Sequence, residues 1–372
     1  MADEAHTPAQ LGKDKQRGLS QWDLMFIKFR RHRLAMFSGV FLIIVYIVIL
    51  FAEFFSPYPT NEKFGKFVYT PPMPVWFWDN NGPSRPYVYG YKQELDMETF
   101  QRTYTADTEQ KYYIRFFTRG AEYSLLGIIK TDLHFFGVDE PGLIFLFGTD
   151  RFGQDVFSRV LTGAQVTLTA GMLSVAISVV LGAVLGTLSG YYGGVVDLVV
   201  QRVIEFLSSI PRIPLWMTLA AVLPTDWSSV RIYFGIITIL AFLGWMGMAR
   251  EVRGKVLILR SMDYVMAAKA SGASSSYNIF KHMLPNALSH IIVVATLAVP
   301  VMIIVETSLS FLGFGIQPPM TSLGALLREA QNVQSVVNFP WLFSPAIVII
   351  VTTLAFNFLG DGLRDAADPY SQ

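Results

Sequence analysis

The chain has 372 residues, of which 52% are hydrophobic and only 15% are charged. This balance excludes an ordinary soluble protein, because a soluble protein of 372 residues carries more charged residues on its surface. The formal charge of +1 gives no support for nucleic-acid binding, and the lack of cysteine excludes disulfides and cysteine-ligated metals.

The polar segment 1–33 ends in a pattern typical of a helix on a membrane surface. Its apolar residues recur at helical spacing with basic residues between them, and Ser20 and Asp23 suit the start of such a helix. The apolar set is Trp22, Met25, Phe26 and Phe29. We interpret the segment as a cytoplasmic N-terminus with an interfacial helix on the inner leaflet. The alternative is an ordinary basic stretch beside the membrane.

The first two membrane spans follow from uncharged runs. Leu34 to Ala52 has the length that crosses a bilayer and lacks a signal-peptide cleavage pattern, so we expect residues 34–55 to form a retained first span. A second span is predicted over Thr167 to Gly190. Glycines at four-residue spacing indicate close helix packing there. They are Gly182, Gly186, Gly190 and Gly194.

Residues 56–147 separate these two spans and are rich in tyrosine, with Trp76 and Trp78 among the other aromatic residues. Flexible linkers are poor in aromatic residues, so the composition predicts a small folded insertion. Its aromatic residues either fill a core of its own, which we favour, or form a surface for a second protein.

Four further spans are predicted in the rest of the chain. The third, from about Phe206 to Leu223, must leave nearby charges outside the bilayer core and is expected to bend at Pro211 and Pro214. The remaining three are Ile232 to Ala249, Asn286 to Leu309 and Val336 to Leu359. Pro285 suits the first turn of the fifth helix.

Basic residues near the membrane edges give the orientation. They precede the first span and follow the fourth, which marks both places as cytoplasmic. With six spans both termini lie in the cytoplasm, together with residues 250–285, and the insertion 56–147 lies outside. The basic residues are Lys28, Arg30, Arg31, Arg33, Arg250, Arg253, Lys255 and Arg260.

The cytoplasmic loop carries the most specific motif of the chain. Asp263 to Gly272 reads DYVMAAKASG, and HMLP follows after nine residues. This pattern resembles the EAA loop of ABC importer permeases. In that family the loop is a short helix, a glycine-permitted turn and a second helix that dock into a groove on a separate ATPase. The resemblance implies ATPase coupling through Asp263, Tyr264, Ala267, Ala268, Gly272, Leu284 and Pro285. Met266 stands where the family has its glutamate.

Three other stretches strengthen the resemblance and place it among permeases of the dipeptide, oligopeptide and nickel class, second-permease type. They are Gly148 to Arg159, Glu306 to Gly315 with its continuation to Gly324, and Asn357 to Pro369. The resemblance implies an all-α integral membrane protein of the type I permease fold with six transmembrane helices. Residues 148–372 are then the core permease domain, and 56–147 are a periplasmic insertion.

The resemblance also implies partners and location. We expect a homologous permease, two cytoplasmic ABC ATPases, a periplasmic substrate-binding protein and the lipid bilayer of the bacterial inner membrane. No phosphate-binding loop occurs, since Gly254-Lys255 is followed by Val256 and lacks the earlier glycine, so ATP and Mg are expected on the ATPases and no cofactor or metal on this chain. The chain is not expected to be an enzyme.

Glu306 is an acid on an otherwise apolar span, which by default marks a pathway or a buried partner. It either faces the translocation path or, as we favour, has a structural role with a helix end or Arg328. The alternatives to an ABC permease are a secondary transporter or channel working alone and a membrane-anchored sensor. The cargo stays open among peptides, nickel chelates, oligosaccharides and opine-like compounds.

Overall fold

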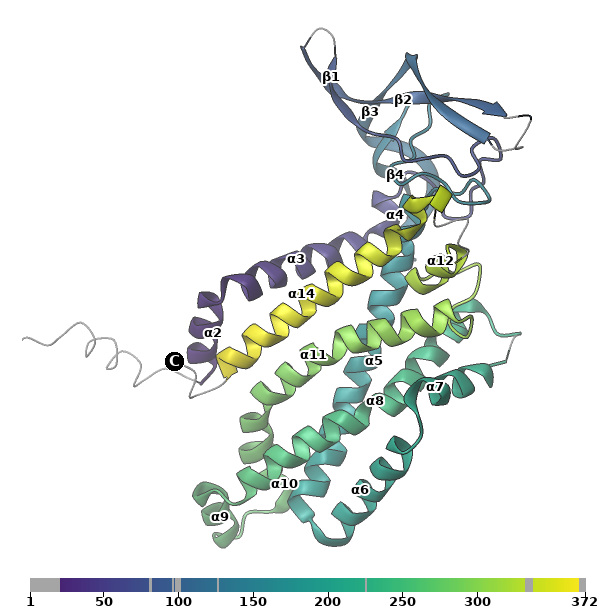
Figure 1. Ribbon diagram of the computed structural model, residues 1–372. Coiled ribbons are helices and arrows are strands. Elements are labelled where there is room, and N and C mark those ends of the chain that lie inside the picture. The colour runs from purple at the N-terminus through teal and green to yellow at the C-terminus, as the bar shows by residue number, and fades with distance from the viewer. Residues whose placement is uncertain are drawn as a thin grey trace, which may run out of the picture.

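The computed structural model describes residues 21–79, 82–95, 97, 102–125, 127–224, 226–331 and 337–367. Long helices run side by side, and a small β-sheet stands at one end of them (Figure 1). The opposite end carries the short helices α9 (Asp263–Ala270) and α10 (Ser275–Tyr277). The insertion and the loop 250–285 therefore lie at opposite ends of the helices, as the predicted orientation requires.

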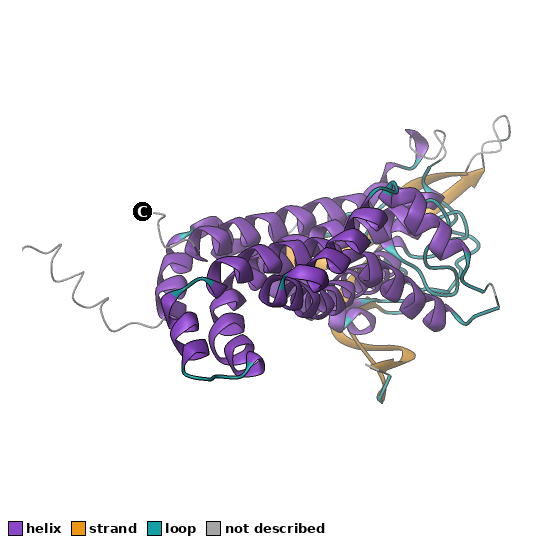
Figure 2. Cartoon of the chain, turned by 90° about the horizontal axis from the view of Figure 1, so that it is seen from below, coloured by secondary structure: helices purple, strands orange, loops and turns teal. Residues whose placement is uncertain are grey.

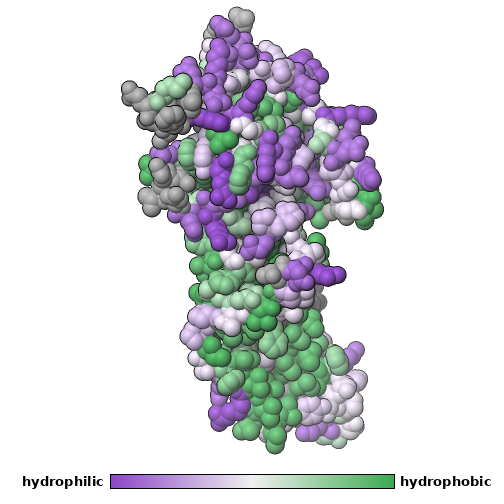
Figure 3. Space-filling view, turned by 90° about the vertical axis from the view of Figure 1, so that its right-hand side faces the viewer, coloured by the Kyte–Doolittle hydropathy of each residue, from purple (hydrophilic) through white to green (hydrophobic). Residues whose placement is uncertain are grey.

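Five helices of the described part are long and apolar enough to cross a membrane. Hydrophobic side chains cover the helical part of the surface, whereas the part with the sheet is mostly polar (Figure 3). Five of the six predicted spans fall on these helices, and the six-span count stays a prediction. They are α3 (Arg33–Leu50), α5 (Val156–Tyr192), α8 (Ser229–Arg260), α11 (Leu284–Phe311) and α14 (Ser344–Ala367).

The third predicted span is not one bent helix. Helix α6 (Gly194–Ser208) ends where that span was expected to begin, and α7 (Arg212–Ala221) starts after a break. Pro211 precedes α7 and has no N–H to continue a helix, while the Ser209 N–H closes α6 on the Glu205 carbonyl. The proline that was expected to bend this segment instead interrupts it.

The last long helix is shifted toward the C-terminus. It was predicted over Val336 to Leu359, but a 3₁₀ turn η2 (Pro340–Phe343) precedes α14, and Val336 lies outside the described residues. Pro345 suits the first turn of α14. The helix continues past its apolar part to Ala367, because helical hydrogen bonds do not require apolar side chains.

Glycines of α5 allow its close packing on α8. A Cβ at Gly186 would collide with the backbone of Ala249, and Gly182 and Gly190 are equally crowded by α8. Gly194 was predicted to share this role, but it begins α6 and has open space around it. The small-residue pattern is thus confirmed for three of its four glycines.

The N-terminal helix is present as α2 (Gln21–Arg31), and α2 packs on α14. His32 then starts α3, because its Nδ1 accepts the Ala35 N–H at 3.1 Å. The predicted position of α2 at the inner leaflet stays a prediction. Ser20 and the side chain of Trp22 lie outside the described part.

The insertion is folded, as its composition predicted. After the short helix α4 (Ala52–Phe55), four antiparallel strands follow one another in sequence order. The long third strand pairs with β2 along its first half and with β4 along its second. The strands are β1 (Trp76–Asp79), β2 (Gly82–Leu95), β3 (Arg102–Leu125) and β4 (Ile129–Val138).

The sheet has its own apolar core, built from one face and from the chain segments on either side of it. Val88 and Phe136 from the strands pack with Met73, Ile144 and Phe145. The sequence analysis favoured a core role for the aromatic residues of the insertion, and this prediction is confirmed for residues such as Phe145. It is wrong for Trp76 and Trp78, which are exposed.

Candidate functional site

The loop between α8 and α11 forms a compact pair of short helical segments. Helix α9 (Asp263–Ala270) is followed by a turn, by α10 (Ser275–Tyr277) and by a π-helical stretch η1 (Asn278–Met283) that runs into α11. Pro285 occupies the first turn of α11, as predicted. The short first helix, the turn and the second helical segment expected for this loop are therefore present.

Gly272 makes the turn. Its φ of +83° lies in the left-handed region, and a Cβ there would meet no other atom within 4 Å. The constraint at this position is therefore the backbone conformation and not the space around it. The Ala273 N–H returns to the Ala268 carbonyl at 3.0 Å, which ends α9. Ser274 then caps α10 by accepting the Tyr277 N–H.

One side of α9 is fixed to the membrane helices. Val265 is buried in a cluster with Val256 and Leu259 of α8, Met283 of η1 and Ala287 of α11. Because this cluster joins α9 to the ends of both flanking helices, a displacement of α9 would disturb the packing of both. Neither Val265 nor Met283 was singled out from the sequence, since each is an ordinary apolar residue there.

The other side of α9 is exposed. Tyr264, Met266 and Ala267 face outward, and Ala268 is half-buried. Met266, at the position of the family glutamate, is 52% exposed, so whatever binds this face meets a thioether and not a carboxylate. Leu284 is half-buried beneath the loop and Pro285 is exposed. The predicted loop residues thus divide into an outward face and a supporting base.

A groove of about 1030 Å³ runs beside α9. Tyr191 and Tyr192 of α5 line it together with Arg260 of α8 and Lys269 of α9. The Arg260 guanidinium donates to the Tyr191 carbonyl at 3.0 Å, which ties the end of α8 to the end of α5. The ends of two membrane helices, α5 and α8, therefore meet next to the exposed face.

The same end of the bundle contains a strong ion pair. Arg253 of α8 donates from Nε and Nη2 to the two carboxylate oxygens of Asp197 on α6, at 2.5 and 2.6 Å. The hydrogen bonds from this guanidinium hold the pKa of Asp197 below its usual value. Two-point pairing fixes the direction of both side chains and so joins α6 to α8.

Asn278 begins the π-helical stretch and is fully buried. Its side-chain amide has no hydrogen-bond partner in the described part of the chain. A buried amide without partners costs about 1–3 kcal/mol, and single π-turns are frequent at functional sites. The sequence held no signal for this residue.

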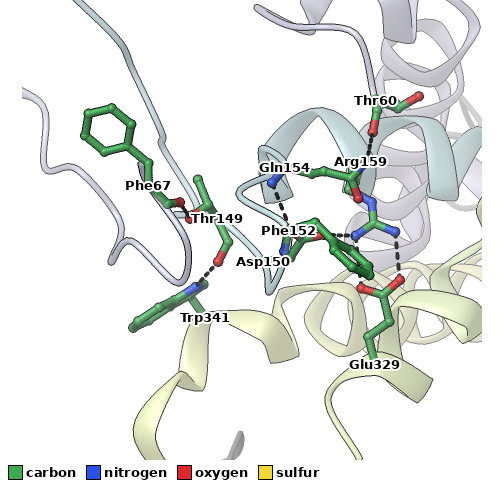
Figure 4. A network of polar contacts seen from close by, with 9 residues as sticks. All are labelled: Thr60, Phe67, Thr149, Asp150, Phe152, Gln154, Arg159, Glu329 and Trp341. Carbon is green, nitrogen blue, oxygen red and sulfur yellow. Dashed lines mark hydrogen bonds and ion pairs between the residues drawn. The ribbon is translucent and has the colours of Figure 1, made fainter. Parts of the chain in front are cut away.

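The Gly148 to Arg159 segment forms a second polar site at the opposite end of the helices (Figure 4). Arg159 is buried near the start of α5 and donates to both carboxylate oxygens of Glu329 on α12 (Leu323–Glu329), at 2.8 and 3.0 Å. It also pairs with Asp150. Asp150 in turn accepts the Phe152 and Gln154 N–H groups, both at 2.8 Å.

This second site also ties the sheet domain to the helices. Thr149 accepts the Thr70 N–H at 2.8 Å and donates to the Phe67 carbonyl, while its own carbonyl accepts from the Trp341 indole at 3.0 Å. Gln154 donates to the Thr60 carbonyl at 3.1 Å. The motif is therefore a structural junction between α5, α12, η2 and the segment that leads into the sheet.

Glu306 lies inside the bundle and is fully buried in α11. One carboxylate oxygen accepts from the Ser310 hydroxyl at 2.7 Å, and the other has no hydrogen-bond partner in the described part of the chain. The suggested pairing with Arg328 is wrong, because in the described part Glu306 forms no ion pair and the Arg328 guanidinium lies beside Gly313. A role of Glu306 in the translocation path stays a prediction.

Comparison with known proteins places this arrangement in a family. Residues 178–370 match the family described as binding-protein-dependent transport system inner membrane component, and residues 20–72 match the N-terminal TM domain of oligopeptide transport permease C. A crystal structure of an amino acid ABC transporter with histidines overlaps at a TM-score of 0.41 and 20% identity, over 54% of this chain and 91% of that chain.

Two relatives match about two thirds of the chain. The glutathione transport system permease protein GsiD of Salmonella paratyphi A is 45% identical over 229 residues, which are 62% of this chain and 73% of the relative. The oligopeptide transport system permease protein OppC of Bacillus subtilis is 34% identical over 249 residues, 67% of this chain and 77% of the relative. The chain therefore belongs to the binding-protein-dependent transport system inner membrane components, the permeases of ABC importers.

Proposed function

We propose that this permease carries peptides or small peptide-like solutes across the bacterial inner membrane. The support is the similarity to permeases named for glutathione and for oligopeptide transport, at 45% and 34% identity. Both named solutes contain peptide bonds. They favour this class over the nickel chelates, oligosaccharides and opine-like compounds that the sequence left open.

The driving force comes from ATPases that dock on the loop 250–285. The observation that carries this step is the outward face of α9, which presents Tyr264 and Met266 beside a groove of about 1030 Å³ while its other side is buried. The small side chains of Ala267 and Ala268 let a partner approach the helix closely. ATP and Mg are bound by those ATPases, and this chain binds no cofactor.

Movement passes from α9 into the bundle through Val265. This side chain is buried in one apolar cluster with Leu259 at the end of α8 and Met283 before α11. A displacement of α9 therefore moves both helix ends together, as in a rigid-body transition between two packed states. ATP favours one of those states through contacts at the loop that differ between them.

The complete importer contains a homologous permease, two ATPases and a periplasmic binding protein. The sheet domain lies on the periplasmic side and both termini of this chain lie in the cytoplasm. Placement of the sheet domain and of α9 at opposite ends of the helices supports this orientation (Figure 1). The permease itself is not an enzyme.

Cysteine crosslinking tests the docking step directly, because the sequence has no cysteine of its own. Ala267→Cys should crosslink to a cysteine in the ATPase groove in inverted vesicles. Ser228→Cys is the matched control: it precedes α8 at the far end from the loop, roughly 48 Å away for a straight helix of this length. It should give no crosslink.

Two outcomes would overturn the proposal. One is the absence of an ATPase crosslink from Ala267→Cys and from neighbouring exposed positions such as Lys269→Cys. The other is ion-coupled uptake by this chain alone in vesicles without ATP, which would favour the stand-alone secondary transporter or channel.

A further inference from the structure

The hairpin of β3 and β4 has an apolar turn. Its sequence is Leu125-Leu-Gly-Ile-Ile129, where hairpin turns ordinarily carry Gly, Asn, Asp or Ser. Ile128 is 83% exposed and Ile129 is 60% exposed. Large apolar side chains are stabilised when they are removed from water, and the sheet domain by itself does not cover these two.

Two more large apolar residues are exposed at the base of the same hairpin. Phe116 is 55% and Phe117 is 63% exposed, although neighbouring residues of a regular strand face opposite sides. Phe117 has a φ of +57°, in the left-handed region, which breaks the alternation. Both rings therefore remain outside the core of the sheet domain.

The base of the hairpin is fixed to the outer end of the first membrane helix. Phe54 and Phe55 of α4, directly after α3, pack on Phe135 of β4 with ring centroids 5.9 and 5.2 Å apart. The Phe54 ring also lies 6.3 Å from that of Phe117. Because α3 crosses the membrane, this aromatic cluster marks the level at which the bilayer ends.

His134 connects the hairpin to the end of α4. Its ring is buried, with Nδ1 2.6 Å from the Ser56 carbonyl oxygen and Nε2 2.9 Å from the Ala121 carbonyl oxygen. It therefore joins both strands of the hairpin to the residue that ends α4. A hairpin held in this way keeps a constant position relative to the bilayer surface.

The views of the whole molecule agree with a position beside the membrane. Strands project sideways past the outline of the helices (Figure 2). Hydrophobic side chains are also present at the lower margin of the mostly polar sheet domain, next to the hydrophobic surface of the helices (Figure 3).

We propose that the β3–β4 hairpin rests in the outer leaflet of the bilayer, with Phe116, Phe117, Ile128 and Ile129 in contact with lipid. Lipid is the occupant because this apolar surface continues from the lipid-facing surface of α3 through Phe54. Among the described residues this half of β3 pairs with β4 alone, so the two outer edges of the hairpin have no neighbouring strand there. It therefore stays at headgroup depth, because hydrocarbon does not accept unpaired backbone groups.

A fluorophore at the turn tests this placement in the full chain. Ile128→Cys is labelled with an environment-sensitive dye in vesicles of phosphatidylethanolamine and phosphatidylglycerol, with Trp78→Cys on the exposed strand β1 as the matched control. Lipids with a nitroxide near the headgroup should quench the dye at 128 several-fold more than the dye at 78. Quenching should weaken when the nitroxide is moved to the end of the acyl chain.

Other results would overturn the proposal. Equal quenching at 128 and 78 by a water-soluble quencher, with none from lipid, would place the hairpin in water. Loss of aqueous quenching at 128 only after addition of the periplasmic binding protein would make the hairpin a protein-docking surface. Neither readout needs ATPase or transport, so this proposal and ATPase docking can fail independently.

Discussion

Arg159 at the start of α5 and Glu329 at the end of α12 form a two-point ion pair, although 170 positions separate them. The pair is largely buried, and Asp150 shares the guanidinium. A guanidinium that satisfies two carboxylates inside a protein cannot be removed without leaving negative charges unpaired. Arg159 therefore joins the start of α5 and the Asp150 loop to α12, beside the contacts that tie the sheet domain to the helices.

Arg159→Met should destabilise the protein by about 3–5 kcal/mol, because it leaves Asp150 and Glu329 without a counter-charge. Thermal unfolding in detergent measures the loss. Arg202→Ala is the matched control, since Arg202 forms an exposed pair with Glu205 on α6 and its loss should cost less than about 1 kcal/mol. Equal effects of the two substitutions would contradict the assignment.

Gly272→Val should abolish ATP-dependent peptide uptake while membrane insertion stays normal. A β-branched residue in the left-handed conformation costs about 1–2 kcal/mol and would open the turn between α9 and α10. Gly254→Val is the control, because Gly254 also has open space around it but lies within α8. Full uptake by Gly272→Val would argue strongly against coupling through this loop.

Glu306→Gln should retain uptake and ATPase activity, because glutamine still accepts from the Ser310 hydroxyl. Glu306→Leu removes that acceptor and should lower stability by about 1–3 kcal/mol. Uptake and unfolding are measured on the same preparations. Loss of uptake in Glu306→Gln at unchanged stability would instead place the carboxylate on the translocation path.

Gly186→Ala should weaken the α5–α8 contact by about 1–3 kcal/mol, because the added methyl group meets the Ala249 backbone, which cannot rotate away. Gly247→Ala on the open side of α8 should be neutral or slightly stabilising. Unfolding midpoints of the two variants in the same detergent provide the comparison. A similar midpoint for both would show that the packing is looser than described.

Asp155 caps α5 by accepting the Ser158 N–H and hydroxyl, at 2.9 and 2.6 Å. Burial raises the pKa of its carboxyl from 3.8 to about 6. An acid whose pKa rises on folding binds its proton more tightly in the folded state, so its contribution is fully present below pH 3.8 and declines up to about pH 6.

Asp155→Asn keeps the cap and removes this charge. It should therefore stabilise the protein above pH 6, by at most about 3 kcal/mol, and leave stability unchanged near pH 4. Unfolding midpoints of both proteins across this pH range test the sign. A variant that is less stable than the parent at pH 8 would contradict it.

The sequence by itself determined the membrane class, the five long apolar helices of the described part and the shape of the loop between α8 and α11. These depend on local properties: the length of an apolar run, a glycine at a turn, a proline at a helix start. The break between α6 and α7 was missed because the same prolines are compatible with a kinked helix and with an interrupted one.

Only the tertiary structure decided which side chains meet. A buried arginine such as Arg159 needs a carboxylate partner. The sequence alone does not show that Glu329, among all the acidic residues, is that partner. Likewise Glu306 accepts a hydrogen bond from Ser310 and does not pair with Arg328. Val265 of α9 is buried because residues of α8 and α11 meet it in one apolar cluster. Contacts between distant positions depend on how whole helices pack, and that packing is the sum of many apolar contacts that a single sequence does not specify.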